Sequence, residues 1–172
     1  MLDFRQRLQS VRRGALGRWI GARSEFPEPG PESASACRVV CIASGKGGTG
    51  KSIVATNLAV ARAAAGERVL LVDFDAGLAN AHLLLGLSPS FALGHVMEGT
   101  ATPVEALVNG PGGVSLLSGG VGRLALANAT RRELERLFRQ LQTLEDLFDL
   151  IVVDHGAGLS YATVAHLAAT ST

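Results

Sequence analysis

The chain has 172 residues, 47% of them hydrophobic and 18% charged, and a formal net charge of +1. This composition is typical of one globular domain, and the near-neutral charge argues against nucleic acid or an anionic membrane as a partner of the whole chain. No apolar run approaches the roughly 20 residues of a membrane span and no signal-peptide pattern is present, so we expect a cytoplasmic protein. The two cysteines, Cys37 and Cys41, are expected to be reduced and buried.

The first 23 residues form a basic segment with six arginines and one acid. One face of the helix that they predict is apolar, and it carries Phe4, Leu8, Val11, Ala15 and Trp19. Three glycines in this segment would each cost about 1 kcal/mol relative to alanine, so the helix needs a surface on which to form. The alternatives are a helix packed on its own domain, a frayed tail, a helix in a groove of a partner, or a peripheral contact with the inner face of the cell membrane.

Residues 24–36 are rich in proline, serine and glutamate and predict an extended linker. The domain proper therefore occupies residues 37–172. Its apolar runs predict strands at residues 39–44, 69–73, 114–117 and 150–153. Helical patterns occur at residues 52–65, 79–85 and 91–97, from a capping box at residue 130 onward, and at 160–169, with a weaker one at 105–108. This alternation predicts a three-layer, doubly wound α/β fold around a mostly parallel sheet of about four strands.

Residues 45–52 read G-K-G-G-T-G-K-S and lie between the first predicted strand and the first long helix. This is the context of a phosphate-binding P-loop. The loop N–H groups and the helix N-terminus would surround phosphate, Lys51 would reach the outer phosphates, and the Ser52 hydroxyl would ligate Mg²⁺. The predicted nucleotide-binding residues are Gly45, Lys46, Gly47, Gly48, Thr49, Gly50, Lys51 and Ser52.

Carboxylates end two further strands, at Asp73 and Asp75 and at Asp154. Ligands of such sheets bind at the carboxyl ends of the strands. An apolar strand that ends in Asp beside a P-loop indicates a Walker B element, so Asp154 would position Mg²⁺. Asp75 would orient or deprotonate a water. Each aspartate also has a structural alternative, the capping of the next helix, and for Asp73 this alternative is as strong as a functional role.

These residues resemble the MinD/ParA/nitrogenase-iron-protein class of SIMIBI P-loop NTPases. A lysine directly after the first glycine gives the loop the "deviant" Walker A form of that class. Residues 72–87 and 157–160 look most like the MinD branch, in particular its flagellar-number relatives FlhG, FleN and YlxH. The resemblance covers residues 38–172 and leaves out residues 1–36. The positions that match in family order include Lys46, Asp73, Asp75, Asp154, Ala157 and Gly158.

The resemblance implies an ATPase that works as an ATP- and Mg²⁺-dependent dimerisation switch. Lys51 would neutralise the phosphates in cis, and Lys46 would do so in trans across a face-to-face homodimer. Asp75 would position the attacking water, while Asp154 and the backbone N–H of Gly158 would sense Mg²⁺ and the γ-phosphate. Hydrolysis would then separate the dimer. The implied role is control of the number or placement of flagella, or of the division site, through a protein partner.

Several features depart from the family pattern. His155 stands where Thr or Ser is usual, and we expect its imidazole to point to solvent. Ala76, and Ala81 with His82, replace the usual residues in a segment that meets partners. Family members also continue past this length, so the chain looks like a C-terminally truncated domain. Its base pocket would be missing and its first strand would be left at a sheet edge.

Three other functions stay as alternatives. A ParA-type partition ATPase would bind non-specific DNA, but residues 38–172 hold ten Lys and Arg against eleven Asp and Glu and offer no basic excess. An inactive, truncated nucleotide-binding or interaction module is the second alternative. The third is another transfer enzyme of the same superfamily, against which residues 77–80 argue by resemblance.

Overall fold

The computed structural model describes residues 37–75, 79–120, 126 and 129–157. The predictions for residues 1–23, 24–36 and 160–169, and for Gly158, lie outside these ranges. The elements in chain order are β1 (Arg38–Ser44), α3 (Lys51–Ala64), β2 (Val69–Phe74), α4 (Ala81–Leu84), α5 (Leu93–Glu98), β3 (Leu107–Asn109), η1 (Pro111–Gly113), β4 (Ser115–Leu117), α6 (Arg131–Gln142), η2 (Glu145–Leu147) and β5 (Leu150–Ala157).

The strands form one five-stranded sheet in the order β1-β5-β2-β4-β3. The pairs β1–β5, β5–β2 and β2–β4 are parallel, as expected, and β3 pairs antiparallel with β4. Within the described residues β1 lies at an edge of the sheet, as the sequence predicted.

The prediction of a helix at residues 105–108 is wrong, and the described residues form a sheet of five strands rather than about four. Residues 107–109 form β3, in which Leu107 lies opposite Leu117 and Asn109 opposite Ser115. The glycine-rich turn at residues 110–113 reverses the chain, and the N–H of Gly110 donates to the carbonyl of Val114 at 2.7 Å. A short apolar run does not by itself distinguish strand from helix, so here the pairing partner decided the conformation.

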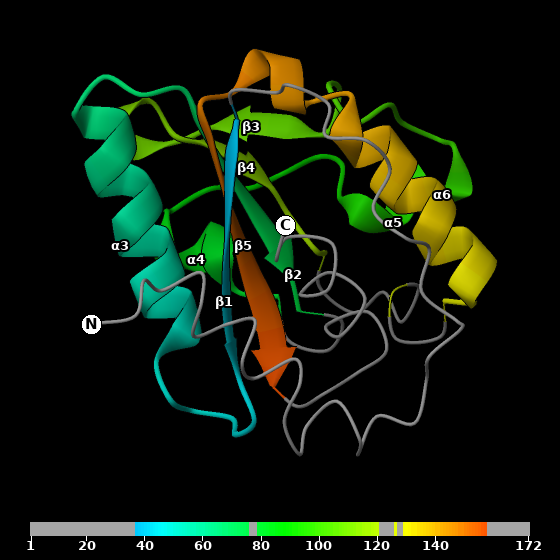
Figure 1. The fold of residues 1–172 in the computed structure, drawn as a ribbon, viewed down its shortest axis with the longest axis horizontal. Coiled ribbons are helices and arrows are strands. Elements are labelled where there is room, and N and C mark those ends of the chain that lie inside the picture. The colour runs from blue at the N-terminus through cyan, green and yellow to red at the C-terminus, as the bar shows by residue number, and fades with distance from the viewer. Residues whose placement is uncertain (1–36, 76–78, 121–125, 127–128, 158–172) are drawn as a thin grey trace, which may run out of the picture. The chain divides into compact units, whose positions relative to one another are not determined.

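The two faces of the sheet bury separate cores. Leu71 and Val152 pack with α3 and α4, whereas Val72 and Val153 pack with α5 and α6. Figure 1 shows α3 on one side of the strands and α6 on the other. Because side chains alternate along a strand, each strand end presents one residue to each layer. This alternation decides which residues of β5 after position 153 lie on the same face of the sheet as α3.

Helix α6 begins where its sequence predicts, whereas α4 and α5 each begin two residues later than predicted. The side chain of Thr130 accepts a hydrogen bond from the N–H of Glu133, whose carboxylate in turn accepts from the Thr130 N–H at 2.8 Å, which completes the capping box of α6. Small side chains on α3, at Ala55, Ala59 and Ala63, are buried and let that helix approach the sheet closely. Among the described helices none has the length and apolar character that a membrane crossing needs.

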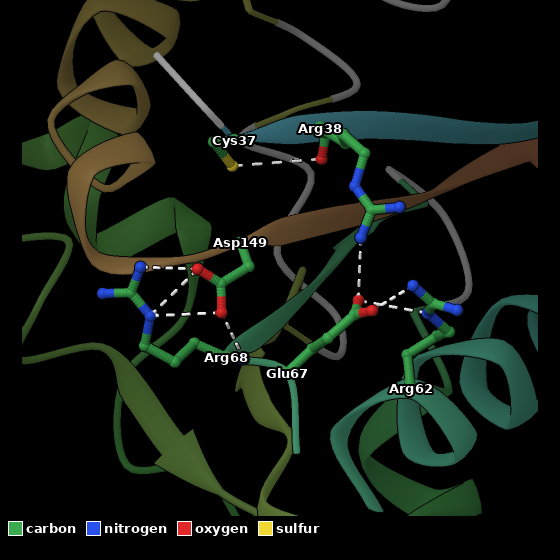
Figure 2. A network of polar contacts seen from close by, with 6 residues as sticks. All are labelled: Cys37, Arg38, Arg62, Glu67, Arg68 and Asp149. Carbon is green, nitrogen blue, oxygen red and sulfur yellow. Dashed lines mark hydrogen bonds and ion pairs between the residues drawn. The ribbon is translucent and has the colours of Figure 1, made fainter. Parts of the chain in front are cut away.

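At the amino-terminal ends of β1, β2 and β5, an ion-pair network joins the strands (Figure 2). Arg68 forms two-point contacts with Asp149, including Nη2 to Oδ1 at 2.6 Å. Arg38 Nη2 donates to Glu67 Oε2 at 2.9 Å, and Glu67 also forms an ion pair with Arg62 of α3. Cys37, which lies beside this network, and Cys41 are both thiols and are half-buried rather than fully buried.

Candidate nucleotide-binding site

The glycine loop leaves the carboxyl end of β1 and enters α3, as predicted. Gly48 and Gly50 adopt φ values of 72° and 86°, in the left-handed region where a side chain would be strained. Gly50 is also the N-cap of α3, so the loop opens directly onto the helix N-terminus. Residues 45–49 are exposed, which leaves the concave backbone of the loop accessible to a phosphate.

Two lysines take different positions in this loop. The ammonium of Lys51 donates to Ser44 Oγ at 3.2 Å and to the carbonyl of Lys46 at 3.4 Å, so it lies over the loop itself. Ser44 Oγ also donates to the Lys46 carbonyl, at 2.7 Å, and lies 2.9 Å from Thr49 Oγ1. The Lys46 side chain makes no hydrogen bond or ion pair with the described residues and is exposed. Sequence reasoning missed Ser44, whose position before the first glycine was the available signal.

The carboxylate of Asp154 is buried at the sheet end beside the start of α3, with 1% of the residue exposed. Neither of its oxygens has a hydrogen-bond partner within the part of the chain described. Burial raises the pKa of Asp154 to about 6, and the charges of Asp73 and Asp75 push it the same way. The Ser52 hydroxyl approaches this carboxylate and lowers its pKa, although the contact does not have the geometry of a hydrogen bond, and the Lys51 ammonium lowers it more weakly. A buried carboxylate without a partner, beside a hydroxyl, fits a hard cation such as Mg²⁺, which binds one or two protein oxygens and completes its shell with phosphate and water.

The two aspartates at the end of β2, Asp73 within the strand and Asp75 just after it, have different surroundings. Asp73 is fully buried, and its carboxylate accepts hydrogen bonds from the N–H groups of Asp75 at 3.1 Å and Ala81 at 2.9 Å. Burial raises the pKa of Asp73, and these backbone hydrogen bonds oppose the shift. Asp73 therefore holds the loop before α4, which supports the structural alternative for this residue. Asp75 is half-buried, and its carboxylate lies against Gly156 of β5, close to Asp154.

The expectation that His155 points to solvent is wrong. Only 1% of His155 is exposed, and its ring lies 5.7 Å from that of Phe74, centroid to centroid. Burial lowers the pKa of His155 to about 4, which favours the neutral imidazole. Because β5 continues to Ala157 instead of ending at Val153, the alternation places His155 in the α6 layer, on the face opposite Asp154. Extending the predicted strand by two residues would have located it.

Comparisons with known proteins agree with this geometry. The family model described as "CobQ/CobB/MinD/ParA nucleotide binding domain" matches residues 40–160. Antiactivator FleN of Pseudomonas aeruginosa is 37% identical over 132 residues, which cover 77% of this chain and 47% of FleN. The flagellum site-determining protein YlxH of Helicobacter pylori is 33% identical over 133 residues, which cover 77% of this chain and 45% of YlxH.

Among solved structures, the chain is similar to the septum site-determining protein MinD of Pyrococcus horikoshii complexed with Mg-ADP. The two are 33% identical with a TM-score of 0.66, and the match covers 77% of this chain and 54% of that one. The chain spans about half the length of the curated relatives it matches. With its P-loop, its mostly parallel sheet and this match over most of its length, the chain belongs to the CobQ/CobB/MinD/ParA family of nucleotide-binding domains.

Proposed function

We propose that the chain binds and hydrolyses ATP as a dimerisation switch of the MinD/FlhG type. The observation that carries this proposal is the buried carboxylate of Asp154, which has no hydrogen-bond partner in the described structure and lies beside Ser52 behind the glycine loop. Burial of an ionisable group without a partner is unfavourable in folding, so its presence at a strand end points to a role in ligand binding.

Each residue of the site has a role that its position supports. Ser52 and Asp154 would hold Mg²⁺, and Lys51 with the loop N–H groups would hold the phosphates. When bound, Mg²⁺ neutralises charge on the phosphate oxygens. Asp75, next to Asp154, would orient the attacking water and accept its proton. The family resemblance adds the backbone N–H of Gly158 as a contact for the γ-phosphate.

A second copy of the chain would complete the site. Lys46 extends from the loop without a partner among the described residues, so its ammonium is available to the phosphates of another protomer. The names of the relatives, an antiactivator FleN, a flagellum site-determining YlxH and a septum site-determining MinD, support a role at the flagellum or the division site. A protein partner there would recognise the ATP-bound dimer, with residues 1–23 as a further contact to a membrane or a partner.

The enzymatic part is tested by phosphate release from the full chain with MgATP. Lys51→Ala and Asp75→Ala should each lower the rate by at least about 100-fold, because one removes charge neutralisation and the other removes water positioning. Arg139→Ala, which removes a charge on the exposed face of α6, is the matched control and should keep the wild-type rate. Equal rates for wild type and Lys51→Ala would contradict the proposal and favour an inactive binding module.

The dimer is tested by mixing two inactive variants, Lys46→Ala and Asp75→Ala. If Lys46 acts in trans, each mixed dimer contains one site with both groups intact. An equal mixture should then recover about one quarter of the wild-type rate, since half of the dimers are mixed and each has one working site. No recovery in the mixture would show that Lys46 acts in cis or does not act.

The cellular role is tested by counting flagella and misplaced septa in cells that lack the gene. Restoring the wild-type chain should correct the defect, and restoring Lys51→Ala should not. If neither count changes on deletion, the flagellar and division-site role fails while the ATPase proposal stands.

A further inference from the structure

We infer that Gly119 and Gly156 are positioning residues that together form a slot for the Asp75 segment. The two glycines come from the two strands that flank β2 in the sheet, since Gly119 follows β4 and Gly156 lies in β5. Neither has a φ in the left-handed region, so what each position requires is space and not an unusual backbone conformation. This inference rests on the proposed role of Asp75 in ATP hydrolysis.

On the β4 side, Gly119 lies in direct contact with the backbone that carries the two aspartates. A Cβ atom at this position would lie 2.7 Å from the carbonyl oxygen of Asp73, 3.3 Å from that of Asp75, and 2.9 Å from the Cβ of Ala79. Real Cβ atoms essentially never approach other heavy atoms within 3.0 Å. The carbonyl of Asp73 cannot easily retreat, because Asp73 belongs to the buried strand β2. A side chain at Gly119 would therefore push the Asp75 segment away from β4.

On the β5 side, Gly156 contacts the side chain of Asp75 itself. A Cβ at Gly156 would lie 3.1 Å from Oδ1 and 3.2 Å from Cγ of Asp75, and 3.5 Å from its Cα. This glycine is two residues from Asp154, so its lack of a side chain lets the two carboxylates approach one another. The two contacts differ in kind: Gly119 limits the backbone of the segment, and Gly156 limits the position of the carboxylate.

The effect on catalysis follows from how precisely a group that orients a reactant must be placed. Misplacing a group that orients a reactant by a fraction of an ångström to one ångström can lower a rate by ten- to a hundredfold. Phosphate binding depends on the glycine loop, and none of the three atoms nearest to the added Cβ at either glycine belongs to that loop. Substitution at Gly119 should therefore lower kcat and leave the KM for MgATP within about twofold of the wild-type value.

The test compares Gly119→Ala with Gly110→Ala in the full chain. Gly110 is the matched control. The two atoms nearest to a Cβ there are the ends of flexible side chains, Leu87 Cδ1 at 3.1 Å and Val114 Cγ1 at 3.2 Å, and neither residue is close to Asp75 in sequence. Gly119→Ala should reduce kcat by about tenfold or more, and Gly110→Ala should leave kcat and KM unchanged. Combining Gly119→Ala with Asp75→Ala should give the rate of Asp75→Ala alone, since the glycine acts through that carboxylate.

A second measurement does not depend on hydrolysis. The amides of Asp75 and Ala81 both donate to the Asp73 carboxylate, so displacement of this segment should speed their hydrogen exchange in Gly119→Ala without nucleotide. In Gly156→Ala the milder contact with the carboxylate should lower kcat while both amides exchange at the wild-type rate. Gly156→Ala also keeps the inference testable if Gly119→Ala does not fold.

The outcomes separate the two proposals. If Asp75→Ala hydrolyses ATP at the wild-type rate, the proposed function fails. If Asp75→Ala is slow but both glycine variants keep the wild-type kcat, with unchanged amide exchange in Gly119→Ala, the slot is overturned and the proposed function stands. Additive losses in the Gly119→Ala/Asp75→Ala double variant would also overturn the slot, because the glycine would then act independently of Asp75.

Discussion

The two ends of strands β1, β2 and β5 carry charge in opposite ways. At their starts, acids and bases are paired and partly exposed, in the network of Figure 2. At their other ends, Asp73 and Asp154 are buried side by side, with Asp75 close to both, and among the described residues the ammonium of Lys51 lies near enough to act on Asp154. The same three strands thus join one end where charges stabilise the fold to another where they oppose it.

The pKa values express this difference. Hydrogen bonds and charge from Arg68 hold the pKa of Asp149 down at about 2, so the folded state favours its charged form. Burial raises the pKa of Asp154 to about 6, so the folded state favours its neutral form. Pairing at the strand starts adds contacts between neighbouring strands where they enter the sheet. The opposite end keeps a carboxylate without a partner in the described structure, which is the arrangement expected of a site that a ligand completes.

The largest expected effect comes from removing the charge of Asp154. Asp154→Asn keeps the size of the side chain but weakens the proposed Mg²⁺ site, so ATP hydrolysis should fall by at least about 100-fold, or about 2.7 kcal/mol. Asp146→Asn, which makes the same chemical change at an exposed position in η2, is the control. Steady-state phosphate release at saturating MgATP measures the effect. A rate within threefold of wild type for Asp154→Asn would remove this carboxylate from the site.

The next effect separates the two buried aspartates that face each other in the β2–β5 register. Asp73→Ala removes the acceptor of two backbone N–H groups, one of them buried, and should destabilise the protein by about 2 kcal/mol. Asp154→Asn removes a carboxylate without a hydrogen-bond partner in the described structure and should stabilise it instead. Urea unfolding without nucleotide at neutral pH measures both. Changes of the same sign would contradict the division into a structural and a ligand-binding aspartate.

A pH series sharpens the same contrast. Because the folded state raises the pKa of Asp154 from about 3.8 to about 6, it binds the proton more tightly than the unfolded chain within that window. The free energy of unfolding should therefore fall as pH rises through the window, and this group should account for a loss on the order of 3 kcal/mol. In Asp154→Asn that part of the loss should be absent. Parallel pH curves for the two proteins would show that Asp154 titrates normally.

The sequence located the residues of the candidate site better than the elements that support them. The positions of the glycine loop, Asp75 and Asp154 at the ends of strands could be predicted because their motifs are local and follow buried strands. The β3 strand could not, since a three-residue run takes its conformation from its partner β4. The burial of His155 depended on how far β5 continues. The slot around Asp75 lay beyond any local pattern, because residues 75, 119 and 156 meet only when three strands pair.

The smallest effect is expected at the strand starts, where Asp149→Asn removes one partner of Arg68. Both side chains are largely exposed, at 42% and 61%, so water and salt weaken their attraction, and the loss at neutral pH should lower Tm by only about 1–4 °C. Since the pKa of Asp149 is depressed to about 2, its stabilisation is present above about pH 4 and should disappear as pH falls toward 2. The difference in Tm between the two proteins should therefore shrink below pH 4, and also in about 1 M salt at neutral pH. The stabilisation by Asp149 is lost as pH falls, whereas that by protonated Asp154 is lost as pH rises, so the two ends of the strands can be compared in one protein. If the difference in Tm between wild type and Asp149→Asn changed with neither salt nor pH, the backbone contacts of Asp149, and not its charge, would hold the strand starts together.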